Sequence, residues 1–406
     1  MKIGIISSLY PPQVMGGAEI VVKKIAEELI KKGYEVFVIT TNNKKESLCE
    51  TIHDVRVYRL PLNLYSIKEF HKHHIFKRML WHLLDLINVK AYGEVNEILK
   101  KENPDLVHLH NYKGLSSLVF RAVNNLEIPF VFTVHDYSPI CVRSNLLNGN
   151  GEICYRKDPA CKLYNAIQST IMGDKVDVVT APSKFVLDKL EAEGLFRNAK
   201  KIVVPNPIEY TPKRYNKTYD TIDILFVGSL SKHKGPDILI KSFKKVDSEN
   251  LRLHIAGRGP MEGELKKLSE GDDRIKFHGF ITGDELQNLY RIANVTVVPS
   301  IWYDNSPMVI YESFANSTPV IASNIGGIPE LVNDGYNGFL FEAKDVSELS
   351  SLIKRSVDNP SILEKCEIGA YRSCKDYEIS CIIKRLMKIY MSCNTNLTIK
   401  KLGAFN

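Results

Sequence analysis

Two carboxylates eight residues apart carry the strongest chemical signal in the chain. Residues 299–312 read PSIWYDNSPMVIYE, which puts Asp304 in a polar stretch and Glu312 about a turn into the helix expected to begin near Pro307. A carboxylate among apolar neighbours, as Glu312 is, is costly to bury without hydrogen-bond partners. We therefore predict that Asp304 and Glu312 accept hydrogen bonds from hydroxyls of a ligand, such as those of a sugar or a ribose. The alternative is a helix-capping acid and an ordinary surface glutamate.

Glycines follow predicted strands at several places and predict contacts with an anion. Gly16 and Gly17 precede the first helix, Gly228 and Ser229 follow one strand of the second half, and Gly257 follows the next. Glycine at a strand end lets a ligand approach the backbone N–H groups at a helix start, which favours anions. The alternative is a set of tight turns.

A lysine close to one of these glycines predicts a contact with phosphate. Lys234 stands next to an expected helix start, where its ammonium would supply a point charge; the alternative is a solvated lysine. The spacing around Gly257 is GxGxxxG, and no acid ends the next strand, which argues against an oxidoreductase that uses a nicotinamide cofactor. A Walker loop is absent as well.

His135 and Asp136 end another predicted strand of the first half. Parallel sheets bind ligands outside the carboxyl ends of their strands, so this pair is a catalytic candidate, although a histidine at such a place is often structural. Cys141, Cys154 and Cys161 follow it with gaps that could hold zinc together with a histidine, but ordinary thiols are the favoured interpretation.

Length, composition and charge limit the classes of protein to which the chain can belong. A chain of 406 residues with 44% hydrophobic and 25% charged residues is expected to fold as two soluble domains. A net charge of +7 is too small to indicate a nucleic-acid binder. The eight cysteines include no CxxC pair, which predicts a cytoplasmic protein. The first apolar run is too short for a signal peptide, and no apolar stretch is long enough for a spanning helix.

Short apolar runs alternate with amphipathic stretches, which predicts an α/β protein with parallel sheets. The expected strands of the first half are 2–8, 35–40, 55–60, 105–110, 130–135, 176–180 and 201–204, and its helices are 17–32, 71–101, 114–126, 162–173 and 183–193. A proline-containing stretch, 206–221, predicts a linker. The second half should hold strands at 222–228, 251–256, 275–278, 294–298 and 319–323, with helices at 235–246, 261–270, 284–290, 308–316, 345–357 and 376–391.

In order and spacing, the motifs resemble glycosyltransferase family 4. The resemblance covers nearly the whole chain and rests on GGAE at 16–19, TVHD at 133–136, FVGSL followed by KG within 226–235, AGRGP at 256–260, the 299–312 segment and GGIPE at 326–330. It implies the GT-B fold, in which two Rossmann-like, doubly wound domains face a central cleft. The domains would be 1–205 on the acceptor side, joined by a C-terminal helix at about 376–406, and 222–375 on the nucleotide-sugar side, with 206–221 as linker.

The resemblance also implies a role for each motif in a retaining enzyme that uses a nucleotide-sugar donor and needs no metal or other cofactor. Lys234 would contact the diphosphate, while Ser229 stands where many relatives have arginine. Asp304 and Glu312 occupy the positions of a Glu-x7-Glu motif, with the first acid shortened and the Asn305-Ser306-Pro307-Met308 loop following it. Glu312 would bind the ribose, His135 the transferred sugar, and the backbone around Phe280 and Ile281 the base.

Two alternative functions share this architecture, namely a nucleotide-sugar epimerase and a non-catalytic subunit that binds nucleotide sugars. The acceptor of a transferase would be a glycan or a lipid-linked molecule. Residues 68–82 mix basic side chains with Phe70, Ile75, Phe76, Leu80 and Trp81, which suits peripheral binding to an anionic membrane at its inner face. The alternative is a helix that packs this apolar side on the core.

Overall fold

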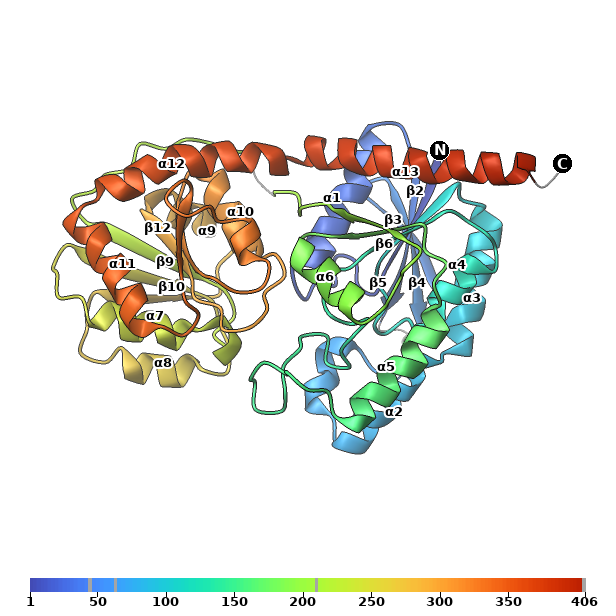
Figure 1. Cartoon of the computed structure of the whole chain (residues 1–406), viewed down its shortest axis with the longest axis horizontal. Coiled ribbons are helices and arrows are strands. Elements are labelled where there is room, and N and C mark those ends of the chain that lie inside the picture. Colours follow the sequence, from blue (N-terminus) through green and yellow to red (C-terminus); the bar gives the residue numbers. More distant parts are fainter. Residues whose placement is uncertain (43–45, 62–63, 209–210, 404–406) are drawn as a thin grey trace. The chain divides into compact units, whose positions relative to one another are not determined.

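The computed structural model describes residues 1–42, 46–61, 64–208 and 211–403. Its contacts divide the chain into two compact units. Unit 1 comprises Met1–Asn145, Tyr155–Pro205 and the residues from Ile379 onward, and unit 2 comprises Leu146–Cys154 and Asn206–Glu378 (Figure 1). Each unit contains one sheet with helices on both faces, which confirms the predicted α/β class and the two doubly wound domains.

The sheet of unit 1 has the order β3-β4-β2-β1-β5-β6-β7-β8 and is parallel except for the edge strand β3. Residues on β1 and β5 are almost all buried, as expected for central parallel strands covered on both faces. The strands are β1 (Lys2–Ser7), β2 (Glu35–Asn42), β3 (Leu48–Ile52), β4 (Val55–Pro61), β5 (Leu106–Asn111), β6 (Phe130–Thr133), β7 (Val178–Ala181) and β8 (Lys200–Val203).

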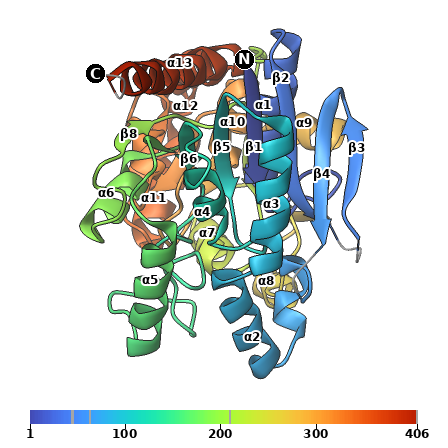
Figure 2. The ribbon, with the colours of Figure 1, turned by 90° about the vertical axis from the view of Figure 1, so that its right-hand side faces the viewer.

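The helices of unit 1 surround this sheet (Figure 2). The C-terminal helix α13 packs against α1 and β5, so the end of the chain belongs to the same unit as its beginning. The helices are α1 (Gly17–Lys31), the short η1 (Ile67–Lys72), α2 (Ile75–Leu86), α3 (Val89–Glu102), α4 (Val119–Asn124), α5 (Pro159–Met172), α6 (Lys184–Ala192) and α13 (Ile379–Gly403).

The predicted helix over 71–101 is wrong, because the structure breaks it into η1, α2 and α3. Ile87 is extended, and the side chain of Asn88 accepts a hydrogen bond from the N–H of Ala91 at 3.0 Å, which starts α3 anew. The predicted helix over 114–126 is shortened to α4. Before α4, the N–H of Gly114 donates to Asp85, and Ser116 has a positive φ of 135°, so this stretch is a loop.

The sheet of unit 2 is entirely parallel, with the order β11-β10-β9-β12-β13-β14. Its strands are β9 (Ile222–Val227), β10 (Leu251–Ala256), β11 (Ile275–Gly279), β12 (Val295–Val298), β13 (Val320–Ser323) and β14 (Gly338–Phe341). Its helices are the short η2 (Lys232–Lys234), α7 (Pro236–Lys244), α8 (Glu262–Leu268), α9 (Gly283–Ile292), α10 (Met308–Ala315), the short η3 (Ile328–Glu330), α11 (Val346–Asp358), α12 (Ser361–Cys374) and the short η4 (Lys375–Tyr377).

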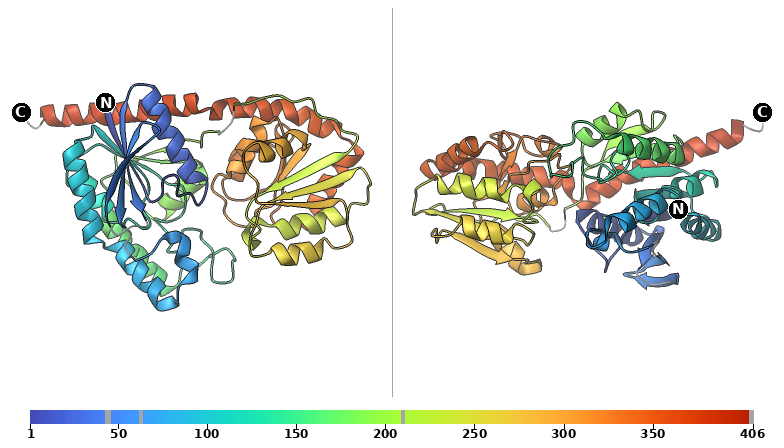
Figure 3. Two further views of the ribbon diagram at one scale, coloured as in Figure 1. Left: turned by 180° about the vertical axis from the view of Figure 1, so that it is seen from behind. Right: turned by 90° about the horizontal axis from the view of Figure 1, so that it is seen from below.

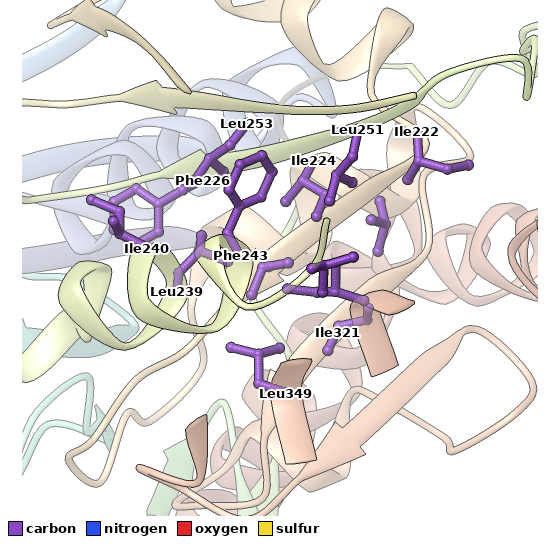
Figure 4. Close-up of a cluster of buried hydrophobic side chains, with 14 of the residues drawn as sticks. Ile222, Ile224, Phe226, Leu239, Ile240, Phe243, Leu251, Leu253, Ile321 and Leu349 are labelled. Atoms are coloured by element: carbon purple, nitrogen blue, oxygen red, sulfur yellow. The ribbon is translucent and has the colours of Figure 1, made fainter. Parts of the chain in front are cut away.

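The two faces of this second sheet are covered by different helices (Figure 3). Beneath α7, α8 and α11 lies a cluster of branched aliphatic and aromatic side chains that includes Phe226, Phe243 and Leu349 (Figure 4). Beneath α9 and α10, smaller clusters form around Tyr290 and Phe314. The apolar sides of the amphipathic helices therefore hold the sheet rigidly from both sides.

The segment predicted as a linker, 206–221, contains no helix or strand in its described part and packs on unit 2. The N–H of Ile208 donates to the carbonyl of Tyr377 at 2.9 Å, and Ile208 is buried. The ammonium of Lys217 donates to the Tyr290 carbonyl at 3.1 Å, near the C-terminus of α9. Burial lowers the pKa of Lys217 to about 8, and the Glu367 charge opposes this shift. None of the helices in the described part of the chain is long and apolar enough to span a membrane.

Candidate active site

The predicted donor residues of unit 2 follow the carboxyl ends of its strands, on the loops there and in the helices that come after them. The chain runs outward from β9 to β10 and β11 and then returns to β12, which pairs with the other side of β9. The loops after β9 and β12 therefore diverge in opposite directions, and this is the switch point at which open parallel sheets bind ligands. Lys234 is on the first of these loops and Asp304 is on the second.

The structure joins Lys234 and Asp304 in an ion pair. The Lys234 ammonium is 2.6 Å from Asp304 Oδ2 and lies 5.3 Å from the centre of the Trp302 ring. The same carboxylate oxygen accepts from Ser300 Oγ at 3.2 Å and from Trp302 Nε1 at 3.3 Å. The pair thus holds a cation in a fixed position over an aromatic ring, which suits it to meet an anionic ligand.

Close backbone contacts make glycine necessary around this pair. A Cβ at Gly257 would lie 1.8 Å from the Gly228 carbonyl oxygen, so the loops after β9 and β10 pack backbone on backbone. A Cβ at Gly326 would lie 2.4 Å from the Asp304 carbonyl oxygen, and φ at Gly326 is +64°. The N–H of Gly327 donates to that carbonyl at 2.8 Å. Gly326 and Gly327 therefore fix the loop that carries Asp304, while Gly228 and Gly257 join the loops after β9 and β10.

Glu312 lies in α10, where its carboxylate accepts a hydrogen bond from the Tyr290 hydroxyl at 2.8 Å. The helix begins at Met308, directly after Pro307, as predicted. In the loop before it, Asn305 and Ser306 are buried, and the Ser306 hydroxyl is 2.6 Å from that of Tyr311. The loop between the two predicted acids is thus held by its own side chains.

The other predicted donor positions of unit 2 are more exposed. Ser229 follows β9 and is exposed. Phe280 and Ile281 follow β11, and the Phe280 side chain is 68% exposed. The resemblance implied a contact between the base and the backbone here, and the exposed Phe280 ring beside it is an aromatic surface on which a base could also pack.

In unit 1, the predicted His135 belongs to a string of imidazoles. His135 Nε2 is 2.8 Å from His110 Nδ1, and their rings stack with centres 5.1 Å apart. The next ring, that of His108, is 4.0 Å from His110, and it bonds Thr133 and the Tyr390 hydroxyl of α13, each at 2.6 Å. The strands β5 and β6 and the helix α13 thus position His135 together.

Burial keeps these imidazoles neutral. It lowers the pKa of His135 to about 4 and that of His108 to about 3, and it holds the pKa of His110 well below its usual range. Burial also raises the pKa of Asp136, whose carboxylate accepts from the Ser138 N–H at 2.7 Å. At neutral pH this site therefore offers imidazoles as neutral donors and acceptors.

The predicted anion contacts of Gly16 and Gly17 lie at the start of α1. A carboxylate of the chain itself is already there: Glu19 Oε2 accepts from the N–H of Gly16 at 2.8 Å and from that of Met15 at 3.2 Å. The geometry agrees with an electropositive helix start, but the carboxylate of Glu19 already accepts the hydrogen bonds of these two N–H groups.

Three residues of these sites were missed by the sequence interpretation. Trp302 was read only as part of a loop, yet its indole contacts both members of the ion pair. Tyr290 lies 22 residues before Glu312 and reaches it only through the packing of α9 against α10. His110 ends the HLH pattern of a predicted strand, which was a usable signal, since alternate residues of a strand share a face.

The residues that the structure describes include no group of three or more His, Cys, Asp or Glu side chains placed to hold a metal ion. The zinc alternative for Cys141, Cys154 and Cys161 therefore has no support within those residues.

Comparison with known proteins adds the following. A model described as Glycosyltransferase Family 4 matches residues 15–211, and one described as Glycosyl transferases group 1 matches residues 208–373. An uncharacterized glycosyltransferase of Methanocaldococcus jannaschii is 27% identical over 96% of this chain and 98% of its own length. The alpha-monoglucosyldiacylglycerol synthase of Streptococcus pneumoniae is 24% identical over 84% of this chain and 75% of its own.

Among solved structures, the HepE protein of Anabaena in complex with UDP superposes with a TM-score of 0.71 and 17% identity, covering 97% of this chain and 100% of that one. The match at this low identity shows the fold alone. It extends across both units, in agreement with the predicted GT-B fold.

Proposed function

The chain belongs to family 4 of the glycosyltransferases, and on that premise we propose that it is a retaining enzyme that uses a nucleotide-diphosphate sugar. The observation that carries the proposal is the Lys234–Asp304 pair at the switch point of the second sheet. The ammonium over the aromatic ring offers positive charge to a diphosphate, and the neighbouring Asp304 carboxylate can accept hydrogen bonds from hydroxyls of the sugar. The Anabaena protein with the same fold is known in complex with UDP.

In this proposal, the Lys234 ammonium shifts from Asp304 to the diphosphate when the donor binds. It then stabilises the negative charge that grows on the leaving diphosphate as the glycosidic bond breaks. Asp304, released from the lysine, accepts hydrogen bonds from hydroxyls of the transferred sugar. Glu312, held by Tyr290, accepts from the ribose hydroxyls.

The neutral His135 contributes to the same reaction from unit 1. An uncharged imidazole can hydrogen-bond a hydroxyl of the transferred sugar without repelling the positive charge that develops on the sugar ring. Burial supports this role, since it lowers the pKa of His135 to about 4. The proposed reaction uses no metal ion, because the Lys234 ammonium and backbone N–H groups stabilise the negative charge of the diphosphate.

The acceptor we propose is a glycan or a lipid-linked molecule at the cytoplasmic face of a membrane. Nucleotide sugars are made in the cytoplasm, so the donor is available on that side. The relative from Streptococcus pneumoniae is named for a glucosylated diacylglycerol. A lipid acceptor requires an enzyme that works at a surface, which agrees with the basic and apolar segment 68–82.

The test is donor turnover by the purified full-length chain with UDP-, GDP- and ADP-sugars, with water as a slow acceptor. Release of the nucleoside diphosphate is measured, and proton NMR identifies the anomer of the sugar that first appears. We expect release from one donor class, with the α-anomer formed first from an α-linked donor. Glu312→Gln should slow release at least about tenfold, as expected for losing a charge-assisted hydrogen bond.

Glu249→Gln is the matched control, because Glu249 is exposed and precedes β10 at the opposite edge of the same sheet. Binding of a nucleotide sugar without release would favour a non-catalytic subunit, and a changed sugar still attached to its nucleotide would favour an epimerase. Initial formation of the β-anomer from an α-linked donor would overturn the assignment as a retaining enzyme.

A further inference from the structure

Helix α2 has its apolar side on the outside. Five large apolar side chains on one face of this helix are between 48% and 74% exposed, namely Ile75, Phe76, Met79, Leu80 and Leu83. Ile87, directly after the helix, is 52% exposed and continues this face. These six residues are called here the α2 face. Soluble proteins seldom leave so many neighbouring large apolar side chains in water unless the patch binds something.

The opposite side of α2 carries Trp81, His82 and Asp85. Trp81 is 2% exposed and Asp85 1% exposed, although the sequence interpretation counted Trp81 among the outward anchors. Phe70 is half-buried, and its ring packs edge-on against Trp81 with centres 5.3 Å apart. Burial, assisted by the charge of Lys113, lowers the pKa of the inward-facing His82 to about 4.

Polar contacts fix this inverted orientation. Asp85 Oδ1 accepts from the N–H of Gly114 at 2.6 Å, and its other oxygen is 3.3 Å from the Lys113 ammonium. The indole of Trp81 donates to the carbonyl of Tyr65 at 3.1 Å. Rotating α2 to bury its apolar side would break these contacts and leave Lys113 as a buried, unpaired charge, which is strongly unfavourable.

The charge around the α2 face is positive. Lys77 is exposed beside it, and Lys72 is exposed just before the helix, 3.9 Å from the exposed carboxylate of Glu69. Asp85, buried on the inner side, is the one acidic residue of α2 itself. The neighbouring helix α5 packs against α2 (Figure 1), and its Leu163 and Lys162 are exposed as well. Apolar side chains with cations at their edge match the acyl boundary and the phosphate layer of an anionic bilayer.

We propose that the α2 face docks the enzyme on an anionic lipid bilayer, with Phe76 and Leu83 inserted below the headgroups and Lys72 and Lys77 at the phosphates. Docking itself is inferred from the α2 face. Only its use, which is to bring the active site to a lipid-linked acceptor, rests on the proposed function. A protein partner with an acidic rim or a second copy of the chain are the other possible occupants. The lysines flanking the face favour the bilayer over a second copy, whose identical lysines would repel them.

The experiment is sedimentation of the full-length protein with vesicles of phosphatidylcholine alone or mixed with phosphatidylglycerol. We expect binding to the mixed vesicles that weakens with added salt, and little binding to neutral ones. The double variant Phe76→Ser/Leu83→Ser should lower the partition coefficient at least about tenfold, because two inserted side chains are lost. Lys72→Ser/Lys77→Ser should remove most of the difference between the two vesicle types.

The control is Ile292→Ser/Ile368→Ser, which removes two similarly exposed isoleucines of α9 and α12 in unit 2 and should bind vesicles like the wild type. Thermal unfolding and nucleotide binding of each variant are measured in parallel. Equal vesicle binding by wild type and Phe76→Ser/Leu83→Ser would overturn the proposal. So would a dimer in sedimentation equilibrium that the same variant converts to monomers. Normal nucleotide binding in either case would leave the donor site unaffected.

Discussion

The two units differ in the charge of their candidate functional side chains and in the elements that position them. In unit 2, a charged pair, Lys234 and Asp304, stands on loops at the switch point of the sheet, and glycine backbones hold those loops together. In unit 1, neutral imidazoles of His108, His110 and His135 lie in a row within and at the end of two strands. One site has full charges with short ion-pair contacts, and the other has no charged imidazole at neutral pH.

This difference separates the tasks of binding charge and touching a neutral sugar. A diphosphate needs fixed cations, and an ion pair keeps such a cation in place until the ligand arrives. A sugar ring that gains positive charge is better served by neutral groups. The comparison therefore predicts that variants of Lys234 and Asp304 in unit 2 change nucleotide affinity, whereas variants of His135 in unit 1 change turnover without changing that affinity.

The largest effect is expected for Lys234→Ala. Loss of the ammonium removes a charged hydrogen bond to the diphosphate, so nucleoside diphosphate affinity should fall about 10- to 100-fold. Isothermal titration calorimetry measures this. The control is Lys241→Ala on α7, which breaks an exposed pair with Asp237 and should leave affinity unchanged. Unchanged affinity in Lys234→Ala would remove Lys234 from the donor site.

The next effect concerns His135→Ala. Loss of a neutral hydrogen bond to the transferred sugar should lower turnover up to about tenfold, with nucleotide affinity kept within about twofold. A comparable imidazole pair exists in unit 2, where His254 and His278 are 3.0 Å apart, so His278→Ala is the control. The division of tasks fails if His135→Ala weakens nucleotide binding as much as it slows turnover.

A smaller effect, of opposite sign for binding and turnover, is expected for Asp304→Asn. The carboxylate repels a diphosphate, so its neutral isostere should tighten nucleoside diphosphate binding up to about fivefold. This factor corresponds to the repulsion of about 1 kcal/mol between two unit charges 4 Å apart in water. Turnover should fall, since the asparagine accepts sugar hydroxyls less well. Weaker binding of the diphosphate would show that Asp304 acts mainly by positioning Lys234.

The smallest effect is the pH dependence of stability in unit 1. The folded pKa of His135, at about 4, lies below its unfolded value of about 6.5, so between these values the unfolded chain binds more protons. Its contribution to stability is therefore complete above pH 6.5 and is lost as the pH falls. From pH 7 to 5.5 one such imidazole costs about 1 kcal/mol, which corresponds to about 2–4 °C in the unfolding midpoint.

His135→Asn removes this proton site, so its midpoint should fall less over the same interval. The comparison with wild type isolates the imidazole from Asp85 and Asp136, whose pKa values are raised by burial and which act in the opposite direction. Differential scanning fluorimetry at both pH values is sufficient. Parallel curves for the two proteins would mean that His135 titrates normally in the folded chain.

The alternation of apolar and amphipathic stretches was enough to predict the central strands of both sheets, because these strands are nearly continuous apolar runs. The edge strands β3 and β14 and the helix α12 were missed. The edge strand β3 has mostly exposed side chains, and α12 carries buried small residues such as Gly369 and Ala370 in place of a clear apolar stripe. The break before α3 depends on Asn88, a cap residue inside a helical pattern.

Individual site residues were predictable because their loops follow strands, but their partners were not. Lys234 and Asp304 are 70 positions apart, and only the strand order places their loops together. Whether Trp81 faces inward or outward also depends on contacts with distant residues, since helical spacing alone fits either orientation of α2.

The most direct test of the account is a crystal structure of the full-length chain with a bound nucleoside diphosphate. We expect the diphosphate to lie at the ends of β9 and β12, within hydrogen-bond distance of the Lys234 ammonium, which has left Asp304. We also expect the base to lie against the Phe280 and Ile281 backbone. A diphosphate bound instead beside Gly16 and His135 in unit 1, with Lys234 still paired to Asp304, would contradict the assignment of the donor site to unit 2.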